Sequence, residues 1–320
     1  MVYIVVLNWN GWKDTISCIE SLMDLNFHSY KIIVCDNNSS DNSIEEIKSW
    51  YYKNKNTYSY LKDSELKFFE DSKELNYSSP VNRAIYLIQT GSNLGFSGGN
   101  NVGIKFALKQ PDLEYIWLLN NDTEVEALAL SFMVERMNQD SKIGLCGSKL
   151  IYDHDRRVIQ GIGGIYNPWL CTSKHYKEGE PKDIELDQTE CESVIDYVIG
   201  ASMLIKKEVF LNVGLLSEDY FLYYEELDYT FRLRRAGYKI GLALNSVVYH
   251  KEGASTKKSK GVVSDFYFVK NKLTLTKKFN IKYLPVVYSS LILVSLNRLR
   301  RFEFFKFINV IRIMFGSKKA

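Results

Sequence analysis

Short hydrophobic runs alternate with amphipathic stretches along the first part of the chain. The runs are continuously apolar, as expected for strands that are covered on both faces of a parallel sheet. Between them, apolar residues at helical spacing follow polar or glycine-rich starts, which predicts helices. The repeated pairs of strand and helix predict an α/β fold with a mostly parallel central sheet flanked by helices. The predicted strands are residues 3–8, 30–35, 84–89 and 115–119, and the predicted helices include 14–23, 98–108 and 127–137.

The pattern changes after about residue 142, where short strands and glycine turns replace the regular alternation. We interpret this second part as a wall or lid over a cleft. Residues 53–80 are polar, aromatic and irregular, which indicates an insertion before the strand at 84–89. The expected elements of the second part are strands at 197–205, 240–244 and 247–250 and a helix at 228–236.

The segment YIWLLNND, residues 115–122, is an apolar run that stops at two Asn residues and an Asp. Open α/β sheets bind ligands beyond the carboxyl ends of their strands. Asn120 and Asp122 are therefore candidates for a site that binds a diphosphate and a divalent cation, since Asp122 offers the hard oxygen that Mg²⁺ or Mn²⁺ prefers. The alternative is an Asn-rich turn followed by a helix capped at Asp122 or Thr123.

Two further polar clusters follow predicted strands. VCDNNSSDNS, residues 34–43, places Asp36 at a strand end, where it is able to accept a hydrogen bond from a base or ribose. NLGFSGGNN, residues 93–101, precedes a helix and allows close approach of a phosphate or sugar to the backbone. The alternative for this cluster is a tight connection. Its glycine spacing differs from GxGxxG, which disfavours a dehydrogenase.

Residues 220–238, YFLYYEELDYTFRLRRAGY, place acidic residues at a helix start after an aromatic run. Pairing with Arg232 four residues later explains Asp228 structurally, but it does not explain Glu226. A carboxylate beside aromatic side chains at the mouth of a cleft is a candidate general base, because partial desolvation raises its proton affinity. His250 ends a strand and is either a structural residue or a metal ligand.

Composition and cysteine use are those of a globular cytoplasmic protein. At 320 residues, with 46% hydrophobic and 25% charged residues, the chain is long enough for one large α/β domain and an appendage. The five cysteines include no CxxC pair, which argues against a disulfide scaffold or a structural zinc site. The N-terminal apolar run has no basic segment before it, so we interpret it as the first strand and not as a targeting signal.

The C-terminal segment differs in charge from the rest of the chain. Residues 270–320 contain twelve Lys and Arg against one Glu, about +11, whereas residues 1–269 carry about −8. Residues 283–296 are apolar but shorter than the roughly 20 residues that a membrane-spanning helix needs. In residues 297–315, apolar residues interleave with cations, which indicates a helix lying on an anionic membrane. The alternative is a basic amphipathic helical pair that packs on the domain or forms a homodimer. Nucleic acid is disfavoured because no base-stacking module is present.

In this order, the motifs VLNWNG, VCDNNSSDNS, NLGFSGGNN, WLLNND, VIGASMLIKKEVF, FLYYEELDYTFRLRRAGY and VVYH resemble those of the family 2 inverting glycosyltransferases of the GT-A fold. The resemblance is strongest to the rhamnosyltransferase-like branch that builds bacterial surface polysaccharides. It covers about residues 2–256. It implies a GT-A domain over 1–256, with a Rossmann-like sheet, a nucleotide-sugar half at 1–141 and an acceptor half at 142–256. Residues 257–320 would then be a helical, basic C-terminal extension.

The resemblance also implies roles for individual residues. Glu226 occupies the position of the general base, and Asp122 and His250 occupy metal-ligand positions. Two departures are visible: Asn120 stands where the family usually has a first Asp, and Glu226 stands where an Asp is common. The implied donor and diphosphate contacts are Asn8, Asn10, Asp36, Asn38, Asn93, Gly98, Gly99, Asn100, Asn120 and Asn121, and the implied acceptor contacts are Gly200, Ala201 and Glu225.

The implied activity is an inverting transfer, dependent on Mg²⁺ or Mn²⁺, of a sugar such as rhamnose from a dTDP- or UDP-linked donor. The implied acceptor is a hydroxyl of a lipid-linked glycan of O-antigen, capsule or cell wall, at the inner face of the cell membrane. A catalytically inactive sugar-binding or assembly subunit fits less well, since both Asp122 and Glu226 are present. A nucleotidyltransferase on a related scaffold would need a basic loop after the first strand, where this chain has only Lys13.

Overall fold

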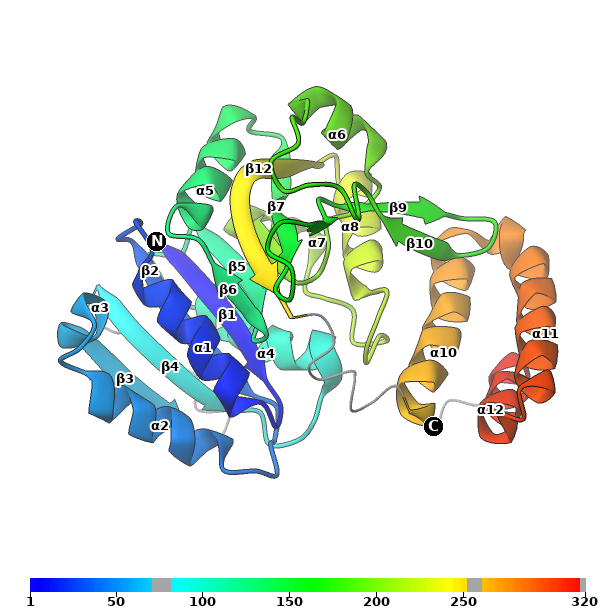
Figure 1. Cartoon of the computed structure of the whole chain (residues 1–320), viewed down its shortest axis with the longest axis horizontal. Helices are drawn as coiled ribbons and strands as arrows, with labels where there is room; N and C mark the ends of the chain where they lie inside the picture. Colours follow the sequence, from blue (N-terminus) through cyan, green and yellow to red (C-terminus); the bar gives the residue numbers. More distant parts are fainter. Residues whose placement is uncertain (71–81, 252–260, 317–320) are drawn as a thin grey trace.

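The computed structural model describes residues 1–70, 82–251 and 261–316. Its centre is a ten-stranded sheet with helices on both faces (Figure 1). Along the sheet the strands are β3 (Ser64–Phe69), β4 (Arg83–Gln89), β2 (Tyr30–Asp36), β1 (Val2–Asn8), β5 (Tyr115–Asn120), β11 (Ser202–Lys206), β7 (Ile143–Tyr152), β12 (Lys239–His250) and β6 (Thr123–Val125), while β8 (Ile159–Gly161) pairs with β7.

Strand direction divides the sheet at β5. From β3 to β5 all neighbouring strands are parallel, so the carboxyl ends of β1, β2 and β5 meet at one edge. β11 then runs antiparallel to both β5 and β7. β12 is parallel to β7 and pairs at its far end with the short antiparallel strand β6. The antiparallel β11 therefore joins the N-terminal half of the sheet to the second half.

The apolar faces of the helices bury the sheet on both sides. Helices on one side supply residues such as Ile19, Ile47 and Met133, and those on the other side supply residues such as Phe106 and Phe210. A two-stranded hairpin of β9 (Gly164–Asn167) and β10 (Thr172–His175) lies outside the main sheet. The first group is α1 (Trp12–Met23), α2 (Ser43–Asn54), α3 (Ser59–Lys62) and α5 (Ala129–Gln139), and the second is α4 (Gly95–Leu108), α6 (Gln188–Val194), α7 (Lys207–Val213) and α8 (Glu225–Arg235).

Glycines let α4 lie directly on the sheet. A Cβ on Gly103 would stand 2.6 Å from Val5 and 2.9 Å from Cys35, and one on Gly99 would stand 2.4 Å from Leu7. The two glycines are one helical turn apart and face the same strands, so any larger side chain would push the helix away from β1 and β2. This close packing fixes the position of the N-terminus of α4 at the sheet edge.

The strands predicted at 3–8, 30–35, 84–89 and 115–119 are confirmed as β1, β2, β4 and β5. Several boundaries in the remaining parts were wrong. The helix cap considered at Asp122 or Thr123 is absent, because the chain continues as β6 and α5 begins only at Ala129. Of the segment at 53–80, α3 and the edge strand β3 are regular, and residues 71–81 lie outside the described part.

Other differences concern lengths. The strand expected at 197–205 begins only at Ser202. The two strands expected at 240–250 form one strand, β12, which is interrupted by a register shift between Ala243 and Val247. The helices expected at 98–108 and 228–236 begin three residues earlier, at Gly95 and Glu225, so the glycine cluster and both glutamates belong to first helical turns.

The C-terminal helices form a separate layer beside the sheet domain (Figure 1). They are α10 (Val262–Phe279), the short turn η2 (Ile281–Tyr283), α11 (Leu284–Arg300) and α12 (Phe304–Met314). Apolar residues of all three helices pack in one cluster with Tyr220, Tyr224 and Leu227. The fully buried carboxylate of Asp228 pairs with Arg232 and with Lys278 of α10, so an ion pair also fastens this layer to α8. None of the described helices is long and apolar enough to cross a bilayer.

Candidate active site

Polar side chains gather where β1, β2 and β5 end. The parallel register places Asn8 beside Asp36 and Leu7 beside Asn120, so the last residues of three strands lie next to one another. The sheet interior before them is apolar and fully buried. This is the edge at which parallel α/β sheets bind ligands.

Asp36 holds the first two of these strand ends together. Its side chain is fully buried, and its oxygens accept hydrogen bonds from Asn8 Nδ2 at 2.7 Å, from Ser39 N at 3.0 Å and from Ser39 Oγ at 2.6 Å. The amides of Asn10 and Asn38 are exposed, and both residues have left-handed backbones with φ of 51° and 60°. Asp36 therefore organises the turn, and its predicted contact with a nucleotide base stays a prediction.

Asn37, which the sequence reasoning did not single out, connects β2 to the start of α4. Its Nδ2 donates to Asn93 Oδ1 at 3.0 Å and to the Gly95 carbonyl at 3.1 Å, and its Oδ1 accepts from the Leu94 amide. Asn93 Oδ1 also accepts from the Gly95 amide. The only signal for Asn37 in the sequence was its position directly after Asp36, which was predicted to bind the nucleotide.

The candidate donor contacts on α4 are tightly packed. Asn100 is buried, and its Nδ2 donates to the Phe96 carbonyl at 3.0 Å. A Cβ on Gly98 would meet Leu94 at 2.6 Å, and one on Gly99 would meet β1, as described above. These contacts explain the small residues by packing, while their predicted place beside a donor sugar stays a prediction.

Asp122 and His250 are brought together by the pairing of β6 with β12. His250 lies opposite Thr123 in that ladder, and His250 Nε2 is 3.2 Å from Asp122 Oδ1. The Lys251 amide donates to the Asp122 carbonyl at 3.0 Å, which fixes the turn after β5. Asn121, which lies between Asn120 and Asp122, donates from Nδ2 to Thr15 Oγ1 at 3.0 Å. Two residues that are more than a hundred positions apart in the sequence thus form one pair.

The pair suits a divalent cation. His250 Nδ1 lies 2.9 Å from Gln160 Oε1, and both His250 and Asp122 are buried. When Nδ1–H donates to Gln160, Nε2 turns its lone pair toward the Asp122 carboxylate, and a proton or a cation is needed between these two acceptors. Carboxylate oxygen and imidazole nitrogen are common ligands of Mn²⁺. In the described residues, no group of three or more His, Cys, Asp and Glu side chains is placed to hold a metal.

Glu225 and Glu226 form the first turn of α8, after two tyrosines with left-handed backbones. Desolvation by the surrounding protein raises the pKa of Glu226 to about 7. Part of the residue remains accessible to solvent. The pKa of Glu225 is raised well above its ordinary value, first by burial and then by the charge of Glu226. Glu225 Oε2 has no hydrogen-bond partner among the described residues. Burial therefore disfavours the charged form of Glu225, and Glu226, which is partly exposed, is the carboxylate that is able to accept a proton.

Glu226 faces the second half of the sheet edge. A Cβ on Gly200 would stand 3.9 Å from Glu226 Cβ and 4.0 Å from Phe96 Cζ, which is ordinary contact distance, so these three residues are neighbours. The neighbouring Ala201 carbonyl accepts a hydrogen bond from the Asn120 amide at 3.0 Å. A short chain of contacts therefore links Glu226, through Gly200 and Ala201, to the end of β5.

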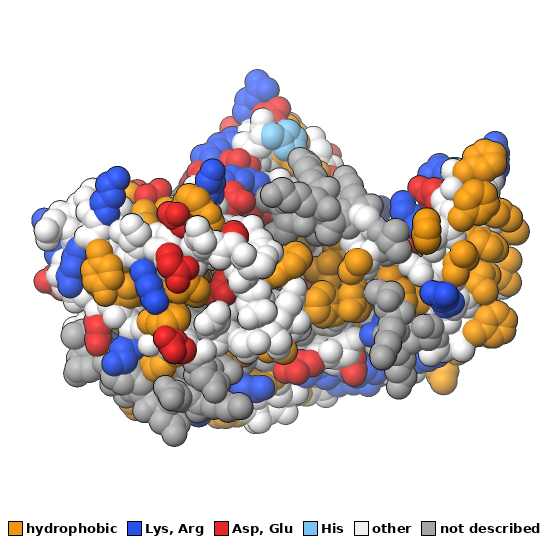
Figure 2. Space-filling view, turned by 90° about the horizontal axis from the view of Figure 1, so that it is seen from below, with side chains coloured by type: hydrophobic (Ala, Val, Ile, Leu, Met, Phe, Trp, Pro, Cys, Tyr) orange, Lys and Arg blue, Asp and Glu red, His pale blue; other side chains and the backbone are white. Residues whose placement is uncertain are grey.

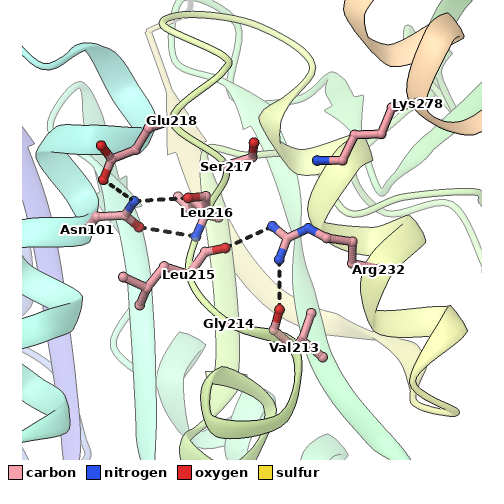
Figure 3. Close-up of a pocket in the computed structure, with 9 residues that line it drawn as sticks. All are labelled: Asn101, Val213, Gly214, Leu215, Leu216, Ser217, Glu218, Arg232 and Lys278. Atoms are coloured by element: carbon pink, nitrogen blue, oxygen red, sulfur yellow. Dashed lines mark hydrogen bonds between the residues drawn. The ribbon is translucent and has the colours of Figure 1, made fainter.

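A cavity of about 400 Å³ lies elsewhere and is not the candidate site (Figure 3). It is lined by Asn101, by residues 213–218, and by Arg232 and Lys278. Its two cations are engaged with buried Asp228, and Arg232 also donates to the Val213 and Leu215 carbonyls at 2.9 and 2.8 Å. These bonds hold the loop before α8 in place, which is a structural role.

No protein-family model matches the chain. Over 161 residues it is 27% identical to the low-salt glycan biosynthesis hexosyltransferase Agl10 of Haloferax volcanii, a match that covers 49% of this chain and 48% of that protein. Over 208 residues it is 24% identical to the dTDP-rhamnosyl transferase RfbF of Shigella flexneri, covering 62% of this chain and 66% of the relative. The chain thus matches between about half and two thirds of the length of these relatives, which are both glycosyltransferases.

Solved structures share the fold over most of the chain. The crystal structure of GalNAc-T7 with UDP, GalNAc and Mn²⁺ has a TM-score of 0.63 at 14% identity, covering 91% of this chain and 50% of that one. The mannosyltransferase PcManGT from Pyrobaculum calidifontis in complex with GDP-Man and Mn²⁺ has a TM-score of 0.58 at 11% identity, covering 99% and 88%. The GT-A fold predicted from the sequence is confirmed, and the resemblance to glycosyltransferases is supported by both comparisons.

The network around Asp36 predicts a loss of stability. Replacing Asp36 by Ala should lower the free energy of unfolding by at least about 2 kcal/mol, because each hydrogen bond to a charged group contributes about 1.5–3 kcal/mol. Urea unfolding measures this loss, and Asn38→Gly, in the exposed part of the same turn, is the control, because glycine tolerates the left-handed backbone at this position. If Asp36→Ala unfolds at the same urea concentration as the control, Asp36 does not organise the turn.

Proposed function

We propose that this chain, which has the GT-A fold and glycosyltransferases as relatives, is an inverting glycosyltransferase that uses a nucleoside diphosphate sugar. The observation that carries the proposal is the chain of contacts from Glu226 through Gly200 to the end of β5, where Asn120 and Asp122 stand. It brings a proton acceptor with a raised pKa to the edge that bears the Asp122–His250 pair. A base on one side and anion-binding groups on the other are what a single displacement needs.

In the proposed reaction, Glu226 removes the proton from an acceptor hydroxyl. The hydroxyl oxygen attacks the anomeric carbon while the bond from that carbon to the diphosphate oxygen breaks, and the nucleoside diphosphate leaves with the bonding electrons. Attack opposite to the leaving group inverts the anomeric configuration. A base with a pKa near the working pH is about half ionised and still basic enough to assist.

Asp122 and His250 would hold a divalent cation, with Gln160 orienting the imidazole ring. When bound, the cation supplies neutralisation of the charge that develops on the departing diphosphate. Because Asn120 stands in place of a second Asp, the protein ligands of the cation would carry one negative charge fewer. The diphosphate would supply the remaining negative charge. Neighbours of the same fold were solved with Mn²⁺ and with UDP or GDP-Man, which supports this class of donor and metal.

For the substrates, we propose a dTDP- or UDP-linked hexose or deoxyhexose such as rhamnose as the donor. The hexosyltransferase and rhamnosyltransferase relatives support this sugar class. For the acceptor, we propose a lipid-linked glycan intermediate of a surface polysaccharide. Gly200 and Ala201, between Glu226 and the end of β5, would border the acceptor hydroxyl.

A lipid-linked acceptor agrees with an apolar surface on the C-terminal helices, here called the α11–α12 face. It consists of exposed apolar side chains at helical spacing on α11 and α12 and at the turn between them. Figure 2 shows a hydrophobic patch at the outer end of the molecule, together with basic groups. Its members and their exposures are Leu293 68%, Leu296 54%, Phe302 78%, Phe304 51%, Phe305 77%, Ile308 43% and Phe315 87%.

We propose that the α11–α12 face lies on an anionic membrane surface. Exposed phenylalanines are costly in water, and contiguous apolar patches of this kind mark interaction sites. The exposed cations Arg300, Arg301 and Arg312 flank the apolar residues, whereas Glu303 is paired with Lys306. Apolar insertion flanked by arginines is the pattern of helices that lie in the plane of a membrane interface. A self-associating dimer is the competing occupant of the same face.

Glu226→Gln should reduce kcat for sugar transfer by about 10²–10⁴-fold and leave donor binding nearly intact, because the amide keeps the shape of the side chain and accepts no proton. Steady-state kinetics and donor titration measure both effects. Glu225→Gln is the matched control, since it makes the same substitution at the neighbouring buried glutamate, and it should change kcat much less. Wild-type kcat/KM should also fall about tenfold per pH unit below pH 7 and level off above it, because only ionised Glu226 accepts the proton.

Retention of more than about a tenth of kcat in Glu226→Gln, equivalent to about 1.4 kcal/mol or less in the barrier, would remove Glu226 from the role of base. Equal losses in both variants would point to a packing role of the turn instead.

The triple variant Leu293→Ser, Phe302→Ser and Phe305→Ser should lose cosedimentation with anionic liposomes, because it removes three of the four most exposed members of the face. Leu211→Ser, on α7 and 68% exposed, is the control and should sediment like wild type. Wild-type binding should weaken with salt, since each surface cation contributes on the order of 1 kcal/mol. Wild-type protein that stays in the supernatant at low salt would contradict the membrane proposal, and a dimer lost in the triple variant would identify the competing occupant.

A further inference from the structure

The segment that leads into Glu226 has an unusual backbone. Tyr223 and Tyr224 have φ of 70° and 74°, a left-handed conformation that bulky residues rarely adopt, and α8 begins directly after them. Two such residues in succession persist only when surrounding contacts hold them. The contacts that hold this pair therefore decide where the first turn of α8, with Glu226, is placed.

Several contacts with the segment around this pair come from one side of α10. Ser264, Tyr267, Asn271 and Lys278 recur at intervals of three, four and seven residues, so they lie along one stripe of the helix. Ser264 Oγ is 2.8 Å from Tyr223 Oη, and the Tyr267 ring stacks on Phe221 with centroids 4.6 Å apart. Lys278, at the far end of the stripe, pairs with Asp228. The stripe thus follows the chain from residue 221 to residue 228.

Asn271 stands in the middle of this stripe and contacts the strained backbone itself. Its side chain is fully buried, and Nδ2 donates to the Leu222 carbonyl at 2.8 Å and to the Tyr223 carbonyl at 3.2 Å. These carbonyls belong to the peptide groups on either side of Tyr223. One amide therefore fixes the orientation of both peptide planes that flank a left-handed residue. Asn271 Oδ1 has no hydrogen-bond partner among the described residues.

We propose that Asn271 is a positioning residue for Glu226, an inference that rests on the proposed function of Glu226 as the base. By holding the two peptide groups, Asn271 sets the direction in which the first turn of α8 leaves the loop. The position of the Glu226 carboxylate relative to Gly200 and the acceptor hydroxyl follows from that direction. The C-terminal layer then contributes to the chemistry through α10, from 45 residues farther along the chain and without touching substrate.

The alternative is that Asn271 only stabilises the fold. A purely structural role would lower stability without changing the ionisation of Glu226 or the balance between kcat and KM. A positioning role predicts that kcat falls while KM for the donor is kept, because the donor contacts lie on other elements. It also predicts that Glu226 titrates differently, since a displaced turn is more accessible to water.

The test compares three full-length variants with wild type. Asn271→Leu keeps the approximate size and removes both donated bonds, and Tyr223→Phe removes only the hydroxyl contact with Ser264. Asn309→Leu is the matched control, because Asn309 is a buried Asn of α12 whose Nδ2 has no partner among the described residues. Kinetics give kcat and KM, thermal unfolding gives stability, and ¹³C NMR of labelled Glu carboxyls, assigned with Glu226→Gln, follows the titration of Glu226.

For Asn271→Leu we expect kcat to fall at least about tenfold with little change in KM for the donor, since misplacement by about 1 Å costs up to about 10²-fold. The Glu226 titration should move from about 7 toward its ordinary range. Tyr223→Phe should shift both in the same direction by less, and it serves as the test if Asn271→Leu does not fold. Kinetics and titration equal to those of Asn309→Leu would overturn the proposal.

Failure of the proposed function gives a different result. Wild-type protein would then transfer no sugar from any donor, while the NMR titration of Glu226 would still respond to Asn271→Leu if the positioning is real. An unshifted titration in a folded Asn271→Leu protein would refute the positioning alone.

Discussion

The candidate site depends on the contact between the end of β5 and the start of β11, where the Asn120 amide donates a hydrogen bond to the Ala201 carbonyl. β5 ends a parallel array whose carboxyl ends carry polar side chains, and β11 runs antiparallel to it, so the chain leading into β11 arrives at the same edge. That arrangement puts Gly200 beside Glu226. If β11 were parallel, residues 200 and 201 would lie at the opposite end of the sheet, and a base and an anion site would not share an edge.

Burial then assigns different roles to similar groups. Asp36 is buried and accepts three hydrogen bonds, which organise the turn after β2. Glu225 is buried, its Oε2 has no hydrogen-bond partner among the described residues, and its pKa is raised well above the ordinary value. Glu226 is only partly covered and has a pKa of about 7. Differences in hydrogen bonding and desolvation, and not in residue type, thus separate a structural carboxylate from the proposed proton acceptor.

The sequence predicts well what depends on local pattern and poorly what depends on distant partners. Continuous apolar runs identify β1, β2, β4 and β5, because a strand buried on both faces must be apolar along its length. Pattern and resemblance together gave Asp122, His250 and Glu226 as candidates. β6 was missed because three residues are too few to show a period, yet its pairing with β12 brings Asp122 to His250.

Gln160, Asn37 and Asn271 were missed for a related reason. Each is a single polar residue in an otherwise ordinary segment, and its importance comes from a contact with a residue that lies far away in the sequence. The charge and apolar content of the C-terminal segment were visible, but the packing of α10 against the loop before Glu226 was not. Because α11 and α12 pack in one cluster with α10, deleting them would uncover apolar residues of α10 such as Phe266 and Val269, so substitutions on the exposed face are the cleaner probe.

We propose that this sheet edge catalyses displacement at an anomeric carbon with inversion. The most direct measurement is ¹H NMR of the sugar first released when wild-type protein hydrolyses UDP- and dTDP-linked sugars in the presence of Mn²⁺, recorded before mutarotation. Water takes the place of the acceptor hydroxyl, so a single displacement assisted by Glu226 predicts release of the anomer opposite to that of the donor, and much slower release by Glu226→Gln. Release of the same anomer as in the donor would contradict the account, as would hydrolysis that is unaffected by Glu226→Gln.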